Sequence, residues 1–209
     1  LGKQLMTLKA KFSDGLTHGL AENQTMDARA LQGLEVLQAP DICPFYIPDD
    51  LDLFTQAKAQ RPRTREIYRA PLVVVKEMMG NNARVAVAVA ERDLVFTDAY
   101  FAASLPTSHK QSAHLLAAIL GSSLASWFFL MTSSEFGIWK RKLLISDVAS
   151  MPVPDLKQAV KSDAGKQLLQ IEKGLRTPAI EGRSWALLDE AVFDLYDIDE
   201  VDRVVVRSG

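Results

Sequence analysis

The sequence contains few of the residues that build disulfides and metal sites. Its 209 residues include one cysteine, Cys43, and three histidines. A single cysteine excludes an intrachain disulfide and any multi-cysteine metal site, and it fits a reducing cytoplasm. His18, His109 and His114 have no His, Cys or Asp at metal-ligand spacing, so no metal site is predicted.

The sequence also lacks the common catalytic motifs. The glycine-containing stretch SDGLTHGL at 13–20 has neither the spacing nor the following lysine of a phosphate-binding loop. There is no Gly-x-Ser-x-Gly elbow. Cys43 is predicted to be a buried, inert thiol, and acidic pairs such as Asp189 with Glu190 are predicted to be a solvated helix face. The chain alone is therefore not expected to be an enzyme.

One long apolar stretch dominates the sequence, which is 48% hydrophobic and 24% charged. The segment SAHLLAAILGSSLASWFFLM at 112–131 is hydrophobic around most of a helical circumference, which indicates a buried helix. Its length is close to the roughly 20 residues that span a bilayer, so a membrane anchor at Ala113–Met131 is an alternative. The central Gly-Ser-Ser and the basic residues near both ends favour the core helix of a soluble domain.

Two details of this segment give further expectations. His114 lies on the apolar helix and is predicted to be a core histidine whose hydrogen bonds are satisfied. The small residues Gly121, Ser122 and Ser123 are predicted to mark a place where another element packs closely against the helix backbone.

The preceding residues predict a β-meander. The segments PLVVVKEMM, RVAVAVA and LVFTDAYF between 71 and 101 are separated by Gly-Asn-Asn and Glu-Arg-Asp turns, which indicates three strands. Alanines at 86, 88 and 90 share one face of the second strand. This small-residue face is predicted to pack on the 112–131 helix.

Weaker patterns complete the prediction. Residues 26–38 are predicted to be helical. Residues 40–48 are predicted to be extended because they contain three prolines, with Ile42, Phe45 and Ile47 packed on the core. Ser146 is predicted to cap a helix. The expected fold class is α+β: an antiparallel or mixed β-meander packed on a long buried helix, with a small helical C-terminal appendage. The expected units are residues 1–156 and 157–209.

Charge is distributed unevenly along the chain. The net charge is −2, but residues 181–202 contain eight carboxylates and one arginine, so this segment carries −7 and the rest carries +5. The most basic window is Gln56–Arg69, which Pro62 and its charges predict to be a loop. A second cluster is formed by Lys140, Arg141 and Lys142. Guanidinium groups pair with phosphate oxygens or with guanine, so both windows are candidate DNA contacts, and solubilising loops are the alternative.

The order of several segments resembles a known family. These are LVVVK at 72–76, the Phe96-Thr97-Asp98 step into Tyr100-Phe101, LLAAILGSSLASWFF, SSEFG with WKRKLL, MPVP at 151–154 and LDEAVFDLYDIDE at 188–200. Over residues 60–206 the chain resembles the C-terminal target-recognition region of adenine-N6 DNA methyltransferases, found in fused restriction-modification and phage-defence enzymes. The chain departs from the family in having Gly121-Ser122 where Asn-Ser is common.

The resemblance implies a function in DNA binding without catalysis. The chain lacks the Asn/Asp-Pro-Pro-Tyr and Phe-x-Gly-x-Gly motifs, so S-adenosylmethionine is expected to bind in an upstream methyltransferase domain of the same polypeptide, and the start at Leu1 suggests a piece of a longer protein. The implied partner is double-stranded DNA, and the parent enzyme is expected to be cytoplasmic. Phosphate contacts are expected at Lys58, Arg61, Arg63, Arg65, Arg69, Lys140, Arg141 and Lys142. The alternative function is a protein-interaction module with an acidic docking tail.

Overall fold

The structure is a computed structural model that describes residues 5–7, 10–17, 20–39, 41–78, 84–133 and 142–208. The strands are β1 (Leu5–Thr7), β2 (Ser13–Asp14), β3 (Met26–Asp27), β4 (Glu35–Leu37), β5 (Lys58–Ala59), β6 (Leu72–Lys76), β7 (Val87–Ala90), β8 (Leu94–Phe96), β9 (Tyr100–Ser104) and β10 (Pro152–Pro154). The α-helices are α1 (Lys110–Leu120), α2 (Ser123–Thr132), α3 (Ile145–Ser150), α4 (Leu156–Ala159), α5 (Asp163–Gly174), α6 (Gly182–Tyr196) and α7 (Glu200–Ser208). The predicted α+β class is confirmed.

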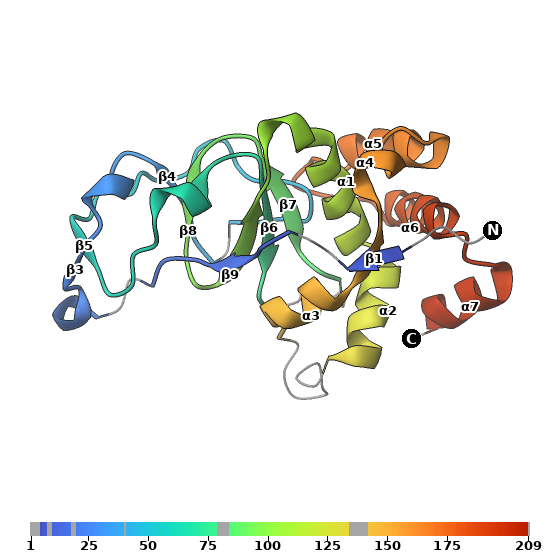
Figure 1. Ribbon diagram of the computed structural model, residues 1–209, viewed down its shortest axis with the longest axis horizontal. Coiled ribbons are helices and arrows are strands. Elements are labelled where there is room, and N and C mark those ends of the chain that lie inside the picture. Colours follow the sequence, from blue (N-terminus) through green and yellow to red (C-terminus); the bar gives the residue numbers. More distant parts are fainter. Residues whose placement is uncertain are drawn as a thin grey trace.

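Three parts follow one another along the longest axis of the molecule (Figure 1). An irregular lobe, made of residues 20–39 and 41–69 and of β8, lies on one side of a central antiparallel sheet of order β2-β9-β6-β7. Helices α1, α2 and α4 to α7 lie on the other side. Short 3-10 helices η1 (Ala21–Asn23), η2 (Arg29–Leu31), η3 (Arg65–Tyr68) and η4 (Thr107–His109) occur in the connections.

The meander prediction is wrong in its third strand. Strands β6 and β7 form the expected antiparallel hairpin, although its Gly-Asn-Asn turn lies outside the described residues. Strand β8 then leaves the sheet and pairs in parallel with β4 of the lobe. The chain returns as β9, which pairs with the free edge of β6. A short apolar strand between turns fits either partner, so the sequence pattern does not decide between them.

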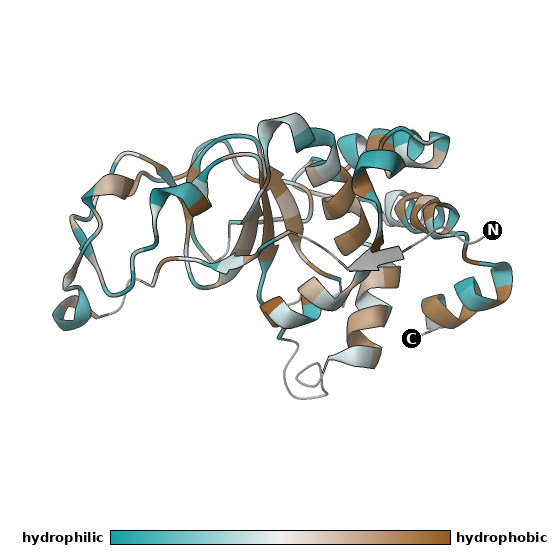
Figure 2. Cartoon of the chain, in the orientation of Figure 1, coloured by the Kyte–Doolittle hydropathy of each residue, from teal (hydrophilic) through white to brown (hydrophobic). Residues whose placement is uncertain are grey.

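The two faces of the sheet bury two different hydrophobic clusters. Val73, Val75 and Val87 belong to the cluster that contains α1, whereas the alternate residues, including the alanines at 86, 88 and 90, belong to the cluster of the lobe. The predicted packing of the alanine face on the long helix is therefore wrong. The small alanines leave room for Tyr68 and Phe96, whose ring centroids lie 5.1 Å apart. Apolar residues line both the sheet and α1 (Figure 2).

The long apolar segment is buried as predicted along α1, but it forms two helices instead of one. Helices α1 and α2 meet at a 64° bend. Ser122 is the N-cap of α2, where its side-chain oxygen accepts a hydrogen bond from the Ala125 N–H. Among the described residues no single helix is long and apolar enough to cross a membrane, and only the bent pair of 107–120 with 123–132 meets that requirement together.

Gly121 confirms the expected close approach of another element. A Cβ atom at this position would lie 2.5 Å from Cζ of Phe45. The Phe45 backbone N–H donates to the Val87 carbonyl over 2.7 Å. Phe45 is 3% exposed, and its ring centroid lies 5.9 Å from that of Trp185. The ring therefore has little freedom to move away from α1.

We expect Gly121→Ala to lower the free energy of unfolding by about 1 to 3 kcal/mol, because the added methyl group overpacks against Phe45. Urea denaturation checks this value. Gly174→Ala is the matched control, since a Cβ at Gly174 has no neighbour within 4 Å and alanine favours the helix. Equal midpoints for the two variants would contradict the packing argument.

The C-terminal helices pack on the same core as α1. Leu168 of α5 and Leu188 of α6 are fully buried in the hydrophobic cluster of α1. The buried face of α6 includes Leu188, Val192 and Leu195, whereas Leu187 is 52% exposed. The helical segment thus covers the sheet through α1.

Three local predictions are wrong. Residues 26–38 form β3, η2 and β4 rather than a helix, because Leu31, Val36 and Leu37 are buried in the core of the lobe and tertiary packing overrides helix propensity. Cys43 is partly exposed rather than buried. Ser146 does not cap α3. Instead the carboxylate of Asp147 accepts a hydrogen bond of 3.0 Å from the Leu144 N–H.

The expected anchors of the proline-rich segment are confirmed. Ile42, Phe45 and Ile47 are all buried. Ile42 and Ile47 lie in the lobe cluster, whereas Phe45 reaches the α1 cluster on the other side of the sheet. This segment therefore joins the two cores.

Candidate nucleic-acid interface

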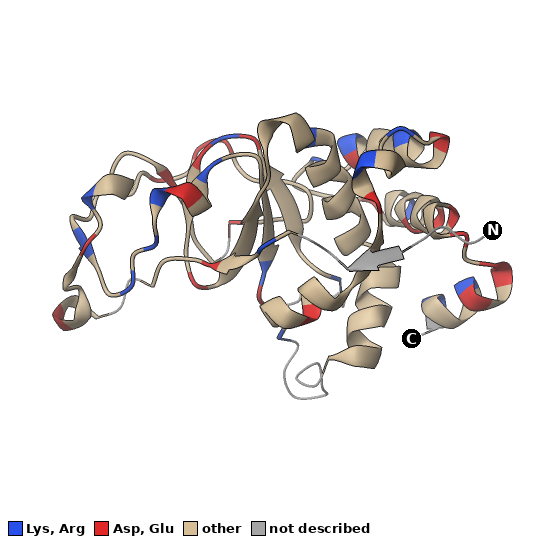
Figure 3. Ribbon diagram, in the orientation of Figure 1, with Lys and Arg blue, Asp and Glu red and all other residues tan. Residues whose placement is uncertain are grey.

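The basic window at 56–69 runs along the lobe, where lysine and arginine positions recur beside β5 and η3 (Figure 3). Apart from these two short elements the window is irregular, as predicted. Lys58, Arg61, Arg65 and Arg69 are exposed, and Arg63 is partly exposed. The five cations therefore remain at the surface, apart from the hydrophobic cores.

Asp14 holds two of these arginines at the edge of the central sheet. Its Oδ2 atom accepts hydrogen bonds from Nη2 of Arg61 at 2.9 Å and from Nη2 of Arg63 at 3.0 Å. Asp14 lies on β2, the edge strand of the sheet. The backbone of Arg61 also exchanges hydrogen bonds with Thr17, so the loop follows this edge.

The second basic cluster approaches the first in space. Lys142 lines the same open hollow as Arg61, and its Nζ atom lies 2.8 Å from Oε1 of Glu77. The hollow, here called the Asp14 hollow, has a volume of about 490 Å³ and is lined by Asp14, Thr17, Arg61, Glu77, Asp98, Ala99 and Lys142. Lys140 and Arg141 lie outside the described residues.

Sequence reasoning missed the acidic side of this hollow. Asp14, Glu77 and Asp98 bring three carboxylates against the two cations Arg61 and Lys142. No spacing rule connects these three acidic positions, because the sheet brings them together. A phosphate that approaches the hollow must therefore compete with carboxylates for the guanidinium groups.

The remaining predicted residues are dispersed. Arg63 lines a neighbouring hollow of about 380 Å³ together with Phe12, Ile67 and Ile145. Arg65 donates from Nη1 to the Ala30 carbonyl at 3.3 Å. Lys58 and Arg69 line neither hollow. The structure therefore brings together Arg61, Arg63 and Lys142, and it places Lys58, Arg65 and Arg69 along the surface beyond them.

His114 is a satisfied core histidine, as predicted. The residue is 4% exposed, with Nδ1 3.0 Å from Oε1 of Glu172 and Nε2 3.0 Å from Oε1 of Glu91. Arg176 donates two hydrogen bonds to Oε2 of Glu172 and one to Oε1. Hydrogen bonding from Lys110 and then His114 holds the pKa of Glu91 below its usual value. Within the described ranges no group of three or more His, Cys, Asp or Glu could hold a metal ion.

Three carboxylates of the acidic C-terminal segment form ion pairs within the chain. Asp189, predicted to be solvated, is buried and forms a 2.6 Å ion pair with Arg84. Arg203 binds both Glu190 at 2.9 Å and Asp194 at 2.7 Å. These contacts give Asp189, Glu190 and Asp194 partners within the chain.

No protein-family model and no curated protein match the chain. Three solved structures that match are of restriction-modification enzymes. The type IIL restriction-modification enzyme MmeI, solved in complex with DNA, is similar over 97% of this chain with a TM-score of 0.55 and 10% identity. The match covers 35% of the MmeI chain, so this chain spans about a third of that length.

Two further structures match less closely. The type IIG restriction endonuclease BpuSI has a TM-score of 0.41 at 16% identity, over 60% of this chain and 17% of that chain. A type I restriction-modification system has a TM-score of 0.46 at 11% identity, over 99% of this chain and 45% of that chain. At these identities the finding is the fold that this chain shares with part of MmeI.

Proposed function

We propose that the chain is the DNA target-recognition part of a restriction-modification enzyme. The observation that carries the proposal is the fold shared over 97% of the chain with an enzyme solved in complex with DNA. The convergence of Arg61, Arg63 and Lys142 around the edge strand of the sheet supports it, because arginine and lysine are the residues that contact DNA phosphates.

In this proposal the rigid sheet positions the lobe against double-stranded DNA. The exposed cations of the 56–69 window and Lys140 to Lys142 hold the phosphate backbone, which fixes the register without reading sequence. The methyl transfer to adenine, with bound S-adenosylmethionine, is assigned to an upstream methyltransferase domain that extrudes the target base. Such an enzyme acts in the cytoplasm, where foreign DNA enters a cell.

The test is duplex binding by the complete polypeptide over a range of salt concentrations. The logarithm of the association constant is expected to fall linearly with the logarithm of salt, by about 0.9 for each phosphate contact. Fluorescence anisotropy with a labelled duplex measures this slope. Binding that is absent, or independent of salt, would remove the basis of the proposal.

Asp14→Asn is expected to increase the affinity for duplex DNA by roughly 5-fold, or about 1 kcal/mol. Its carboxylate competes with phosphate for Arg61 and Arg63, so neutralising it releases both guanidinium groups. Asp163→Asn, an exposed change on α5, is the control for the altered net charge. Weaker binding by Asp14→Asn than by the control would indicate that Asp14 positions the arginines instead of competing for them.

A further inference from the structure

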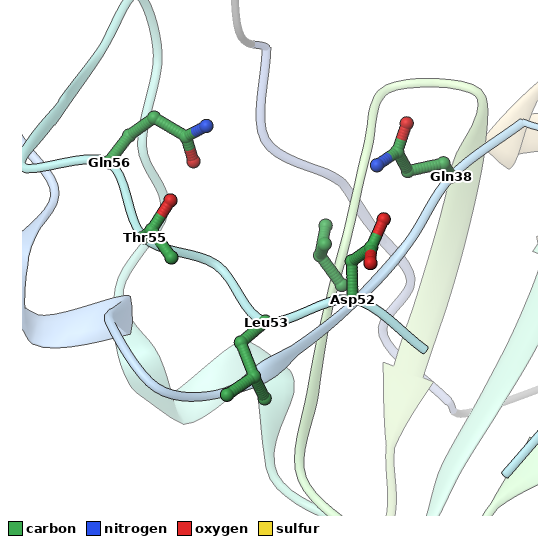
Figure 4. Close-up of a pocket in the computed structure, with 6 residues that line it drawn as sticks. Gln38, Asp52, Leu53, Thr55 and Gln56 are labelled. Carbon is green, nitrogen blue, oxygen red and sulfur yellow. The ribbon is translucent and has the colours of Figure 1, made fainter. Parts of the chain in front are cut away.

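A second hollow on the lobe has a different chemical character from the Asp14 hollow. This polar hollow has a volume of about 400 Å³ and is lined by Val36, Gln38, Asp52, Leu53, Thr55 and Gln56. Figure 4 shows the amide groups of Gln38 and Gln56 extending from opposite sides toward one space, with the oxygens of Asp52 and Thr55 directed into it. Donors and acceptors therefore converge on an open surface.

The backbone beneath the polar hollow is β4, which pairs with β8 on one side and with the segment around Leu53 on the other. The Val36 N–H donates to the Asp52 carbonyl at 2.8 Å, and the Phe54 N–H donates to the Leu34 carbonyl at 2.8 Å. Phe54 is 1% exposed and anchors its segment in the lobe core. Gln32 adds a 2.7 Å hydrogen bond to the Thr55 carbonyl. The hollow thus rests on rigid elements, which a recognition surface requires.

The polar groups at this hollow are not used by the fold. Within the described ranges the side chains of Gln38, Asp52 and Gln56 make no hydrogen bond or ion pair, although all three are exposed. None of the described residues that line the hollow is a lysine or arginine, and the Asp52 carboxylate repels phosphate. The hollow is therefore unsuited to the DNA backbone and suited to a neutral, heteroatom-rich surface.

Base edges have this chemistry. A glutamine amide pairs with N6 and N7 of adenine, a carboxylate accepts from N4 of cytosine, and an apolar side chain contacts the thymine methyl group. Leu53 is 56% exposed and also lines the hollow, but its side chain is directed away from the amides (Figure 4), so the polar groups alone carry the comparison. The amide and carboxylate partners named here, N6 and N7 of adenine and N4 of cytosine, are presented in the major groove of B-DNA.

We infer that the polar hollow reads base edges in the major groove and that Gln38, Asp52 and Gln56 determine sequence specificity. This inference rests on the proposed function, and it adds the surface on which the recognised sequence depends. Lys58 follows Gln56 by two residues on the adjoining β5, so phosphate-binding and base-reading groups adjoin on the same lobe. The two kinds of contact are separable by experiment because only one kind carries sequence information.

The experiment is selection from a pool of randomised duplexes by the complete polypeptide. Gln38→Ala, Asp52→Asn and Gln56→Ala are each expected to lose discrimination at one or two base positions, on the order of 10-fold to 100-fold. The slope of affinity against salt is expected to stay unchanged. Asp50→Asn and Gln60→Ala, exposed changes outside the hollow, are the matched controls and are expected to select the wild-type sequence.

The outcomes separate this inference from the proposed function. If the wild-type protein selects a sequence that all three variants retain, or if the variants change affinity for every sequence alike, the polar hollow is not the reader and the proposed function stands. If the wild-type protein binds duplexes with steep salt dependence but selects no sequence, base reading fails while DNA binding remains. Absence of duplex binding overturns both. Circular dichroism of each variant ensures that folded proteins are compared. Gln56→Glu provides a second substitution at the same position.

Discussion

Arg84→Met is expected to lower the free energy of unfolding by about 3 to 5 kcal/mol, because it leaves the Asp189 carboxylate buried without its cation. Two hydrogen bonds of 2.9 and 2.6 Å join the guanidinium group to this carboxylate. The side chains are only 17% and 11% exposed. Since domains are stable by about 5 to 15 kcal/mol, this single change removes a large share of the total.

The expected loss of stability is large because this ion pair joins three parts of the fold. The guanidinium group lies 4.5 Å from the Trp185 ring centroid and also donates to the Gly121 carbonyl at the bend between α1 and α2. Asp189 of α6 accepts a 2.8 Å hydrogen bond from the Ser123 N–H at the start of α2. Arg84 itself precedes β7 of the sheet. Loss of either charge therefore loosens the sheet, the bend and α6 together.

Urea denaturation of a double variant distinguishes an unpaired charge from lost packing. Arg84→Met with Asp189→Leu removes both charges, and it is expected to recover most of the stability lost by Arg84→Met alone. Arg29→Met is the matched control, because its ion pair with Asp27 is exposed, and it is expected to leave the denaturation midpoint unchanged. If the double variant is no more stable than Arg84→Met alone, the stability is lost through packing and not through the unpaired carboxylate.

Elements with a strong local pattern were predictable from the sequence, and their partners were not. The β-branched residues of 72–76 and 87–90 predicted strands, and the apolar circumference of 112–120 predicted a buried helix. The LVF segment at 94–96 predicted a strand too, but its partner β4 lies in a region predicted to be helical. Pairing depends on tertiary contacts that residue periodicity does not encode.

The candidate interface was predictable only in its cations. Arginines at alternate positions in 61–65 are visible in the sequence, whereas their partner Asp14 comes from an edge strand 47 residues earlier. The polar hollow was missed entirely, because its amides at Gln38 and Gln56 become neighbours only when the 52–55 segment pairs beside β4. Charge clusters can be found by composition. Polar groups that converge from distant positions can be found only once the fold is known.

Reversal of three arginines is expected to have the largest effect on DNA binding. In the complete polypeptide, the triple change Arg61→Glu, Arg63→Glu and Arg65→Glu should lower duplex affinity by about 100-fold or more at moderate salt, because charge-assisted contacts are lost and repulsion is added. The slope of affinity against salt should fall by about 2.7 if each arginine contacts one phosphate. The loss should be the same for every duplex sequence, since phosphate contacts carry no sequence information.

A control with the same change in net charge separates a local interface from diffuse attraction. Lys157→Glu, Lys161→Glu and Lys173→Glu reverse three exposed cations on the helical side, where α4 and α5 form a second group of basic positions in Figure 3. This triple variant is expected to keep most of the affinity, because surface charges farther away than about 10 Å are largely screened at 0.1 M salt.

Replacement of the same three arginines by glutamine removes their charge without adding the repulsion of glutamate. This neutral variant is needed because Arg63 is partly buried, so that a buried glutamate could damage the lobe. The Nε atom of Arg63 is itself buried and has no hydrogen-bond partner in the described residues. An intermediate loss of affinity in this folded variant would confirm that charge, and not a damaged lobe, is responsible. Equal losses for the lobe and helical triple variants would mean that DNA is attracted by overall charge alone. In that case the edge of the sheet around Asp14 would not be the surface that holds the duplex.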